Sequence, residues 1–212
     1  MQEIRKCLIF GDSISTTNFS GGGYEVLLPD LLPVRKIVNF AENAAALTSG
    51  YPYSVCDTVL SHTPEENVDL VILWAGTNDW YYGAPVGDFT SHDKSCSCGA
   101  LRHAALHLSK TYPSAIVLTL TPLYRYSEYD GKELPCHAFE TKNAAGLTLY
   151  DYHTHLLQTA DLIGIPVCDM HALSGINAGN HTLYLRDGTH PSRVGYEKIT
   201  RILAGFASLL LP

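Results

Sequence analysis

Short, almost uninterrupted runs of apolar residues recur along the chain and predict the strands of a sheet. Strands covered by helices on both faces have this pattern, because neither face alternates with positions that meet water. The longer segments between the runs carry apolar residues at helical spacing, so strands and helices alternate. The expected strands are Cys7–Phe10, Lys36–Phe40, Leu70–Trp74, Ala115–Leu120 and Pro166–Cys168, and the expected helices are Gly23–Leu32, Tyr53–Ser61, Gly99–Thr111, Asn143–Leu162 and Arg193–Leu210.

This alternation predicts an α/β protein, a three-layer α/β/α sandwich with a mostly parallel, five-stranded sheet. The 212 residues suit one such domain, so we predict a single domain over residues 1–212. In open parallel sheets, ligands bind beyond the carboxyl ends of the strands. We therefore expect the polar clusters that follow the strands to meet at one edge. They are Gly11–Ser13, Ala41–Ala44, Gly76–Asp79 and Thr121–Pro122.

Composition and charge exclude several classes of partner. The formal net charge is −7, without a long run of Lys or Arg, so we expect no nucleic-acid partner. No apolar stretch is long enough to span a bilayer, and nothing before the first expected strand resembles a secretory signal. We therefore expect a cytoplasmic protein without a membrane partner, with its six cysteines reduced. Whether the chain assembles into a homo-oligomer is left open by the sequence.

The first candidate for chemistry is Ser13, directly beyond the first expected strand. Gly11 allows a tight turn there, which can expose the Ser13 hydroxyl at the sheet edge together with nearby backbone N–H groups. Ser13 is thus a candidate nucleophile. The other interpretation is that Asp12 or Ser13 only caps a following helix.

Two further clusters offer the partners that a nucleophilic serine needs. Asp187 and His190 are three residues apart, so the carboxylate can orient the imidazole while its other ring nitrogen takes a proton from Ser13. Asn78 follows the third expected strand, and its side-chain amide can donate to a developing oxyanion. Taken singly, the first segment also fits a solvated loop and the second an ordinary turn.

Taken together, the three motifs resemble those of the SGNH (GDSL-type) hydrolases. That family has Gly-Asp-Ser near the N-terminus, Gly-x-Asn-Asp in mid-chain and Asp-x-x-His near the C-terminus, matched here by residues 11–13, 76–79 and 187–190. The resemblance implies a flavodoxin-like SGNH hydrolase fold and a serine esterase that needs no metal and no organic cofactor. It also implies the catalytic residues Ser13, Asp187 and His190.

The second oxyanion donor departs from the family pattern. The family usually has a glycine after the second strand whose backbone N–H joins the oxyanion hole, and Ala44 stands at the expected position here. An alanine N–H donates as well, provided that its φ is acceptable to a residue with a Cβ. The expected oxyanion hole is therefore Ser13, Ala44 and Asn78, with Gly50 as the alternative to Ala44 in another register.

Tyrosines and a tryptophan near the expected edge suggest a substrate that is flat on one side and polar at its rim, such as a sugar. Packing of loops or an oligomer interface would explain them equally well. Tyr126 and Tyr129 belong to the same group, and the segment 83–98 reads as a surface loop. The expected substrate-binding residues are Asp12, Trp80, Tyr81 and Tyr124.

Other pairs of potential metal ligands are weaker candidates. His103 and His107 share a helical face, but no metalloprotease motif surrounds them. Cys96 and Cys98 lack the spacing of common zinc or redox motifs. We interpret both pairs as structural.

The leading functional hypothesis is a serine-dependent ester hydrolase that releases a small acyl group, with acetyl expected, from a carbohydrate or similar polar ester. A lipid or thioester acylhydrolase is the second enzymatic hypothesis. A hypothesis of another class is a non-catalytic carbohydrate-binding protein on the same scaffold. The expected partner in every case is a small molecule or a carbohydrate.

Overall fold

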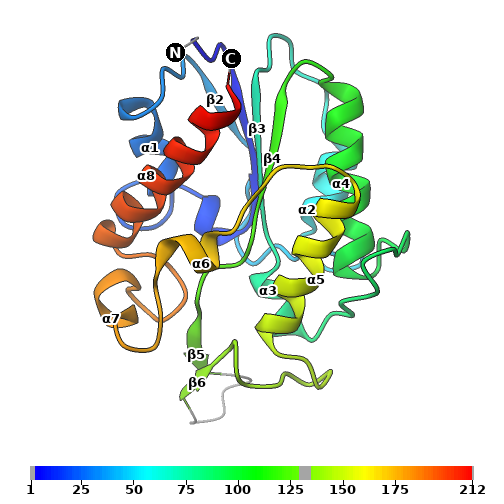
Figure 1. Ribbon diagram of the computed structural model, residues 1–212, viewed down its shortest axis with the longest axis vertical. Helices are drawn as coiled ribbons and strands as arrows, with labels where there is room; N and C mark the ends of the chain where they lie inside the picture. Colours follow the sequence, from blue (N-terminus) through cyan, green and yellow to red (C-terminus); the bar gives the residue numbers. More distant parts are fainter. Residues whose placement is uncertain (1–2, 129–134, 212) are drawn as a thin grey trace.

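The computed structural model describes residues 3–128 and 135–211. Its centre is a parallel sheet of five strands in the order β2-β1-β3-β4-β7, with helices on both faces (Figure 1). The predicted three-layer sandwich is therefore confirmed. The strands are β1 (Cys7–Gly11), β2 (Ile37–Asn39), β3 (Leu70–Trp74), β4 (Ile116–Leu120) and β7 (Val167–Cys168).

Alternate strand residues point to opposite faces of the sheet and build two separate cores. Ile9 and Ile72 belong to one core. Leu8 and Val71, their neighbours in sequence, belong to the other. The first core is covered by α1 (Gly23–Leu27) and α8 (Arg193–Leu210), and the second by α2 (Val55–Ser61), α4 (Ser97–Thr111) and α5 (Leu149–Leu162).

Two expected helices begin or end elsewhere for local reasons. The helix expected from Asn143 begins only at Leu149, because Thr148 and Asp151 form a capping box there. The helix expected to reach Leu32 ends earlier, and its last part is the 3₁₀ helix η2 (Leu28–Asp30), which contains a proline. The ends of helices therefore follow their capping residues rather than the apolar pattern.

Several short elements were not predicted, because each is too short to show a period. They lie in the connections beyond the carboxyl ends of the strands, where the polar clusters were expected to meet (Figure 1). These elements are η1 (Ser13–Ser15), α3 (Thr77–Tyr82), the hairpin β5 (Tyr126–Glu128) and β6 (Pro135–His137), α6 (Met170–Ser174) and α7 (His181–Tyr184).

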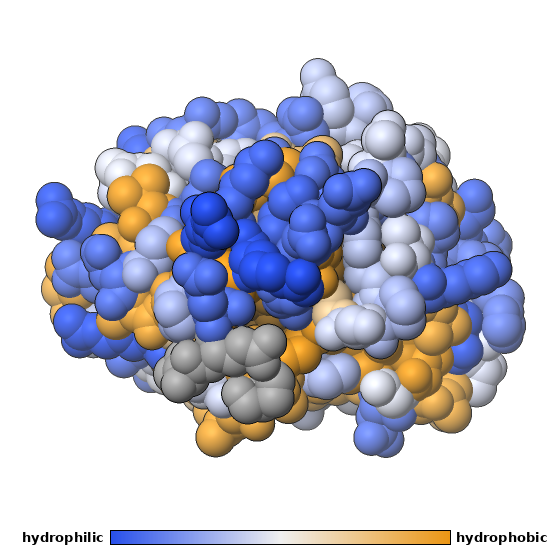
Figure 2. Space-filling model, turned by 90° about the horizontal axis from the view of Figure 1, so that it is seen from above, coloured by the Kyte–Doolittle hydropathy of each residue, from blue (hydrophilic) through white to orange (hydrophobic). Residues whose placement is uncertain are grey.

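The opposite end of the molecule, where both termini lie, is mainly polar. Figure 2 looks onto this end, and hydrophilic residues gather over its middle. The ion pairs Arg5–Asp69 (2.5 Å) and Lys6–Glu65 (2.6 Å) join the segments that precede β1 and β3. Among the described residues, no helix is long and apolar enough to cross a membrane.

The carboxyl end of β1 lies so close to its neighbours that only glycine fits. A Cβ added to Gly11 would come within 2.5 Å of Ser15 Oγ and 2.7 Å of the Trp74 carbonyl oxygen. The β1 and β3 backbones are paired here, Gly11 opposite Trp74. This close approach fixes the position at which the chain leaves β1.

Gly11→Ala should lower the free energy of unfolding by about 1–3 kcal/mol, because the added methyl group must displace backbone or Ser15. The matched control is Gly205→Ala, at a helical position with no atom within 4 Å of the added Cβ. The control should raise stability by up to about 1 kcal/mol through helix propensity. Urea unfolding measures both, and equal effects of the two substitutions would contradict the steric account.

Candidate active site

The structure brings the three expected catalytic side chains together in one hydrogen-bonded row. His190 Nε2 lies 2.9 Å from Ser13 Oγ, and His190 Nδ1 lies 2.9 Å from Asp187 Oδ2. Ser13 and His190 are 177 residues apart in sequence, so this contact exists only in the fold. The side chain of His190 is 20% exposed and that of Asp187 44% exposed, which leaves the row open to solvent along one side.

Ser13 is held by the short helix η1 that it opens. The Asp12 carboxylate accepts a hydrogen bond from the Ile14 N–H (2.9 Å), as a helix N-cap does. Thr16 Oγ1 donates to the Ser13 carbonyl oxygen (2.9 Å), and Tyr196 on α8 donates to the Ile14 carbonyl oxygen (3.0 Å). The first N–H of a helix has no partner within the helix, so the Ser13 N–H can serve an external acceptor.

The loop that carries Asp187 and His190 is folded around the carboxylate. Asp187 Oδ1 accepts the backbone N–H groups of Thr189 (3.1 Å) and His190 (2.8 Å). Burial alone would raise the pKa of Asp187, but hydrogen bonds from the backbone and ring of His190 and from the Thr189 backbone hold that pKa below its ordinary value. Asp187 therefore stays ionised and can stabilise a protonated imidazole.

Gly188 allows this loop to lie against the β5 strand. Its φ is +81°, and a Cβ there would come within 1.6 Å of the Tyr126 carbonyl oxygen. The Tyr126 N–H donates to the Gly188 carbonyl oxygen (2.8 Å). The hairpin thus supports the loop from one side.

Phe19, which the sequence did not single out, supports the imidazole from another side. Its ring is stacked on that of His190, with centroids 4.0 Å apart and an interplanar angle of 16°. The Arg186 guanidinium lies 5.5 Å from the Phe19 centroid. Ser20 Oγ donates to the Pro191 carbonyl oxygen (2.9 Å), which ties the Phe19 loop to the loop of His190. The sequence marks only a turn after Phe19, the run Ser20–Gly23, whose four residues all have positive φ in the structure, and it does not indicate the stacking on His190.

The segment after β2 meets the residues on either side of Ser13. The Glu42 N–H donates to the Gly11 carbonyl oxygen (3.1 Å), and Asn43 Oδ1 lies 3.3 Å from Thr16 Oγ1. Ala44 follows, exposed and with a φ of +62°. Glycine adopts a positive φ readily and a residue with a Cβ rarely does, so Ala44 has a glycine-like backbone conformation, and its role as oxyanion donor stays a prediction.

Asn78 and Asp79 connect the start of α3 to the same segment. Asn78 Nδ2 donates one N–H to the Ala45 carbonyl oxygen (3.0 Å), so its second N–H can serve another acceptor. The buried Asp79 carboxylate accepts the N–H groups of Leu47 (2.6 Å) and Thr48 (3.1 Å). Burial raises the pKa of Asp79, and these hydrogen bonds oppose that rise. Ser13, Ala44 and Asn78 are thus carried by segments that are bonded to one another.

Comparisons with known proteins decide the family. The model of the GDSL-like lipase/acylhydrolase family matches residues 9–198. The chain belongs to this family. A search of curated proteins finds no match.

Solved structures share the acylhydrolase fold over nearly the whole chain. A protein from Lactobacillus plantarum is 20% identical with a TM-score of 0.87, and 100% of each chain is covered. A possible lipase from Chitinophaga pinensis DSM 2588 is 21% identical with a TM-score of 0.75, covering 98% of this chain and 99% of that one. A lipase/acylhydrolase from Enterococcus faecalis is 17% identical with a TM-score of 0.64, covering 99% and 98%. The family supports ester hydrolysis as the activity.

Three residues expected to bind substrate in this acylhydrolase are buried. Trp80 has no exposed surface and donates from Nε1 to the Thr141 carbonyl oxygen (3.2 Å), so its assignment to the substrate site is corrected. Tyr124 is 5% exposed, and its hydroxyl contacts His137 Nδ1. Asp12 is 2% exposed and caps η1. Asp12 and Tyr124 leave little surface for a substrate, and their substrate-binding role stays a prediction.

The other residues singled out in the sequence differ in how far the structure describes them. Tyr81 is half-buried, so its role as a substrate contact stays a prediction. Tyr129 lies outside the described residues. Within the part of the chain that the structure describes, no backbone hydrogen bond joins Gly50, the alternative to Ala44, to the segment of Ser13 as Glu42 is joined to Gly11. All the cysteines are buried thiols, and no cluster of potential metal ligands occurs within residues 3–128 and 135–211.

A buried arginine behind the site was also missed. Arg125 is 7% exposed, and its Nη1 donates to the backbone and hydroxyl oxygens of Thr77, both at 3.2 Å. Its guanidinium lies 5.0 Å from the Tyr81 ring centroid. Burial lowers the pKa of Arg125, and the charge of Asp12 opposes that change. Arg125 was missed because a single arginine after the fourth strand belongs to no periodic pattern that would indicate its burial.

The pKa of Asp12 makes the stability of the protein depend on pH. Burial raises this pKa to about 7, against the hydrogen bond from Ile14 and the charge of Arg125. The folded protein therefore holds the Asp12 proton more tightly than the unfolded chain does. The resulting stabilisation is complete below the unfolded pKa near 4 and is lost as the pH rises through about 7.

Asp12→Asn, which keeps the oxygen that accepts the Ile14 N–H, should remove this dependence. The stability of wild type relative to Asp12→Asn should fall by a few kcal/mol, in order of magnitude, between about pH 4 and pH 8. Urea unfolding of both proteins across this range measures the difference. A difference that is constant with pH, or that grows as the pH rises, would contradict the raised pKa.

Proposed function

We propose that the protein hydrolyses esters through an acyl-enzyme on Ser13. The observation that carries the proposal is the unbroken row from Ser13 Oγ through His190 to Asp187, with both contacts at 2.9 Å. In this row His190 Nε2 is placed to take the hydroxyl proton as Ser13 Oγ attacks the ester carbonyl carbon. Asp187 accepts the hydrogen on Nδ1 and stabilises the imidazolium that forms.

Collapse of the tetrahedral intermediate completes the first half of the reaction. The C–O bond to the alcohol breaks, and His190 returns its proton to the leaving oxygen. Water then attacks the acyl-enzyme, His190 takes a proton from that water, and Ser13 regains its hydroxyl hydrogen as the carboxylic acid leaves. The charge on the carbonyl oxygen is stabilised by the N–H groups of Ser13 and Ala44 and the free N–H of Asn78.

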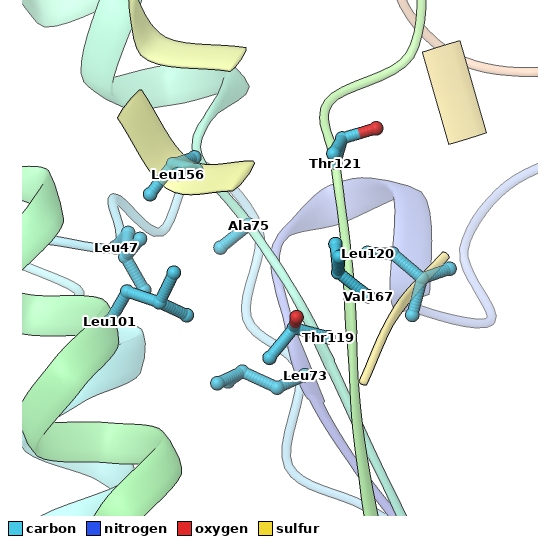
Figure 3. Close-up of a pocket in the computed structure, with 9 residues that line it drawn as sticks. All are labelled: Leu47, Leu73, Ala75, Leu101, Thr119, Leu120, Thr121, Leu156 and Val167. Carbon is cyan, nitrogen blue, oxygen red and sulfur yellow. The ribbon is translucent and has the colours of Figure 1, made fainter. Parts of the chain in front are cut away.

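We propose a small acyl group, with acetyl as the first candidate, because the small cavity nearest the loop after β2 leaves no buried tunnel for a long chain there. A small, mainly apolar cavity of about 10 Å³ lies between the sheet and α4 and α5, and Leu47 of the loop after β2 lines it (Figure 3). This volume admits about one water and no acyl chain. Its lining residues are Leu47, Leu73, Ala75, Leu101, Thr119, Leu120, Thr121, Leu156 and Val167.

A carbohydrate or similarly polar ester is supported by tyrosines beside the turn of residues 42–45, whose Ala44 carbonyl oxygen accepts the Tyr82 hydroxyl. Tyr51 and Tyr82 are stacked with centroids 5.1 Å apart, and Tyr81 meets Tyr82 edge-on at 5.5 Å. The Tyr82 side chain is 38% exposed. Such rings combine an apolar face with a hydroxyl group, which suits the two kinds of surface that a sugar presents.

Ser13→Ala should lower kcat for an aryl acetate by ~10³-fold or more, because the attacking oxygen is removed. The control is Ser114→Ala, at an exposed position before β4, which should retain wild-type kcat. Initial rates with 4-nitrophenyl acetate measure all three proteins. Equal rates for wild type and Ser13→Ala would contradict a Ser13 acyl-enzyme and favour the binding-only hypothesis.

The choice of acyl group is tested by a chain-length series on the wild-type enzyme. With the 4-nitrophenyl esters of acetic to octanoic acid, kcat/KM should be highest for acetate and fall as the chain lengthens. Acetylated and unmodified xylo-oligosaccharides, compared by release of acetate, test the polar alcohol. A preference for octanoate would support the lipid or thioester acylhydrolase instead.

A further inference from the structure

Ala44 stands at a position of its turn where a side chain is unfavourable. The Ala45 N–H donates to the Glu42 carbonyl oxygen (3.3 Å), so residues 42–45 form a turn with Ala44 at its third position. The φ of +62° at Ala44 is the left-handed conformation that turns usually reserve for glycine or asparagine there. Other contacts must therefore hold this peptide in place.

The Tyr82 hydroxyl supplies such a contact. It donates to the Ala44 carbonyl oxygen at 3.0 Å. Asn78 is four residues earlier on α3 and thus on the same helical face, and it donates to the next carbonyl oxygen, that of Ala45, also at 3.0 Å. One face of α3 therefore holds two successive carbonyl groups of the turn.

Tyr82 is itself held in place by neighbouring rings. Its ring is stacked on Tyr51 with an interplanar angle of 17°, while Tyr81 lies edge-on to it. Gly83 ends α3 directly after Tyr82, with its N–H bonded back to the Trp80 carbonyl oxygen (3.1 Å). The hydroxyl of Tyr82 is therefore presented to Ala44 from a fixed ring rather than from a freely rotating surface side chain.

We propose that Tyr82 is a positioning residue that holds Ala44 in its left-handed conformation, so that the Ala44 N–H faces the substrate oxyanion. The inference rests on the proposed function, because it assigns the Ala44 N–H to the oxyanion hole. Within residues 3–128 and 135–211, the Ala44 N–H donates to no protein acceptor, which leaves it available. A return of Ala44 to negative φ turns its N–H away. Tyr82 thus replaces, by a side-chain contact, the conformational freedom of the glycine that is usual in the family.

The test is a double-mutant cycle of Tyr82→Phe and Ala44→Gly, measured with 4-nitrophenyl acetate. In the wild-type background, Tyr82→Phe should lower kcat about tenfold with KM changed less than about twofold, because an oxyanion donor acts in the transition state. In the Ala44→Gly background the same substitution should cost less than about threefold, since glycine adopts positive φ without strain. The activity of Ala44→Gly itself is measured as the reference for that arm.

Tyr53→Phe is the matched control, because it removes a tyrosine hydroxyl from an exposed side chain of the same segment. It should leave kcat unchanged. Equal losses from Tyr82→Phe in the two backgrounds, or a loss in KM rather than kcat, would overturn the positioning role and assign Tyr82 to substrate binding or to general packing.

Amide hydrogen exchange separates this inference from the proposed function. If wild type shows no hydrolysis that depends on Ser13, the proposed function fails, and peptides covering residues 42–46 decide the role of Tyr82. Faster exchange in Tyr82→Phe than in Tyr53→Phe supports the positioning contact. Equal exchange in the two variants overturns it.

Discussion

The close contact between the end of β1 and its neighbours sets the geometry of the whole site. Gly11 pairs with Trp74 of β3 at a distance that excludes a side chain, and the next two residues are the cap and the first residue of η1. β2 lies on the other side of β1, so the strand order changes direction between β1 and β3. Open α/β sheets bind ligands at such a point. Ser13, Ala44 and Asn78 follow the three strands that meet there.

Around this point, buried polar groups hold segments that have no regular structure. Asp79 has no exposed surface, yet its carboxylate accepts two backbone N–H groups of the loop after β2 and the Ser97 hydroxyl (3.0 Å) of α4. An unpaired buried carboxylate would be costly, so its partners are strongly constrained. Asp187 likewise orders its own loop, because its carboxylate accepts two backbone N–H groups of that loop. Two carboxylates thus position the groups that Ser13 needs.

The sheet and the row Ser13–His190–Asp187 could be predicted from sequence because their signals are local and repeated. Apolar runs indicated where the strands lie along the chain, and the spacing of Asp187 and His190 indicated a pair before any fold was known. The supporting contacts could not be predicted in the same way. The stacking of Phe19 on His190 joins residues far apart in the chain, and nothing near Phe19 indicates its partner.

The aromatic residues after Asn78 show most clearly what could not be predicted from the sequence. Trp80 and Tyr82 are two residues apart on α3, so they point to different sides of the helix. Without knowledge of α3, which is too short to show a period, sequence patterns could not tell the buried ring from the exposed one. Ala44 was placed by register alone, and only its φ relates it to the usual glycine.

The central claim is that the fold makes the Ser13 hydroxyl the nucleophile and His190 its base. Reaction with a fluorophosphonate probe, followed by peptide mass spectrometry, tests this claim most directly. The account predicts one adduct per chain, on Ser13, formed at a rate that His190→Ala lowers by ~10²-fold or more. An adduct on another residue, or a Ser13 labelling rate that His190→Ala leaves unchanged, would contradict it.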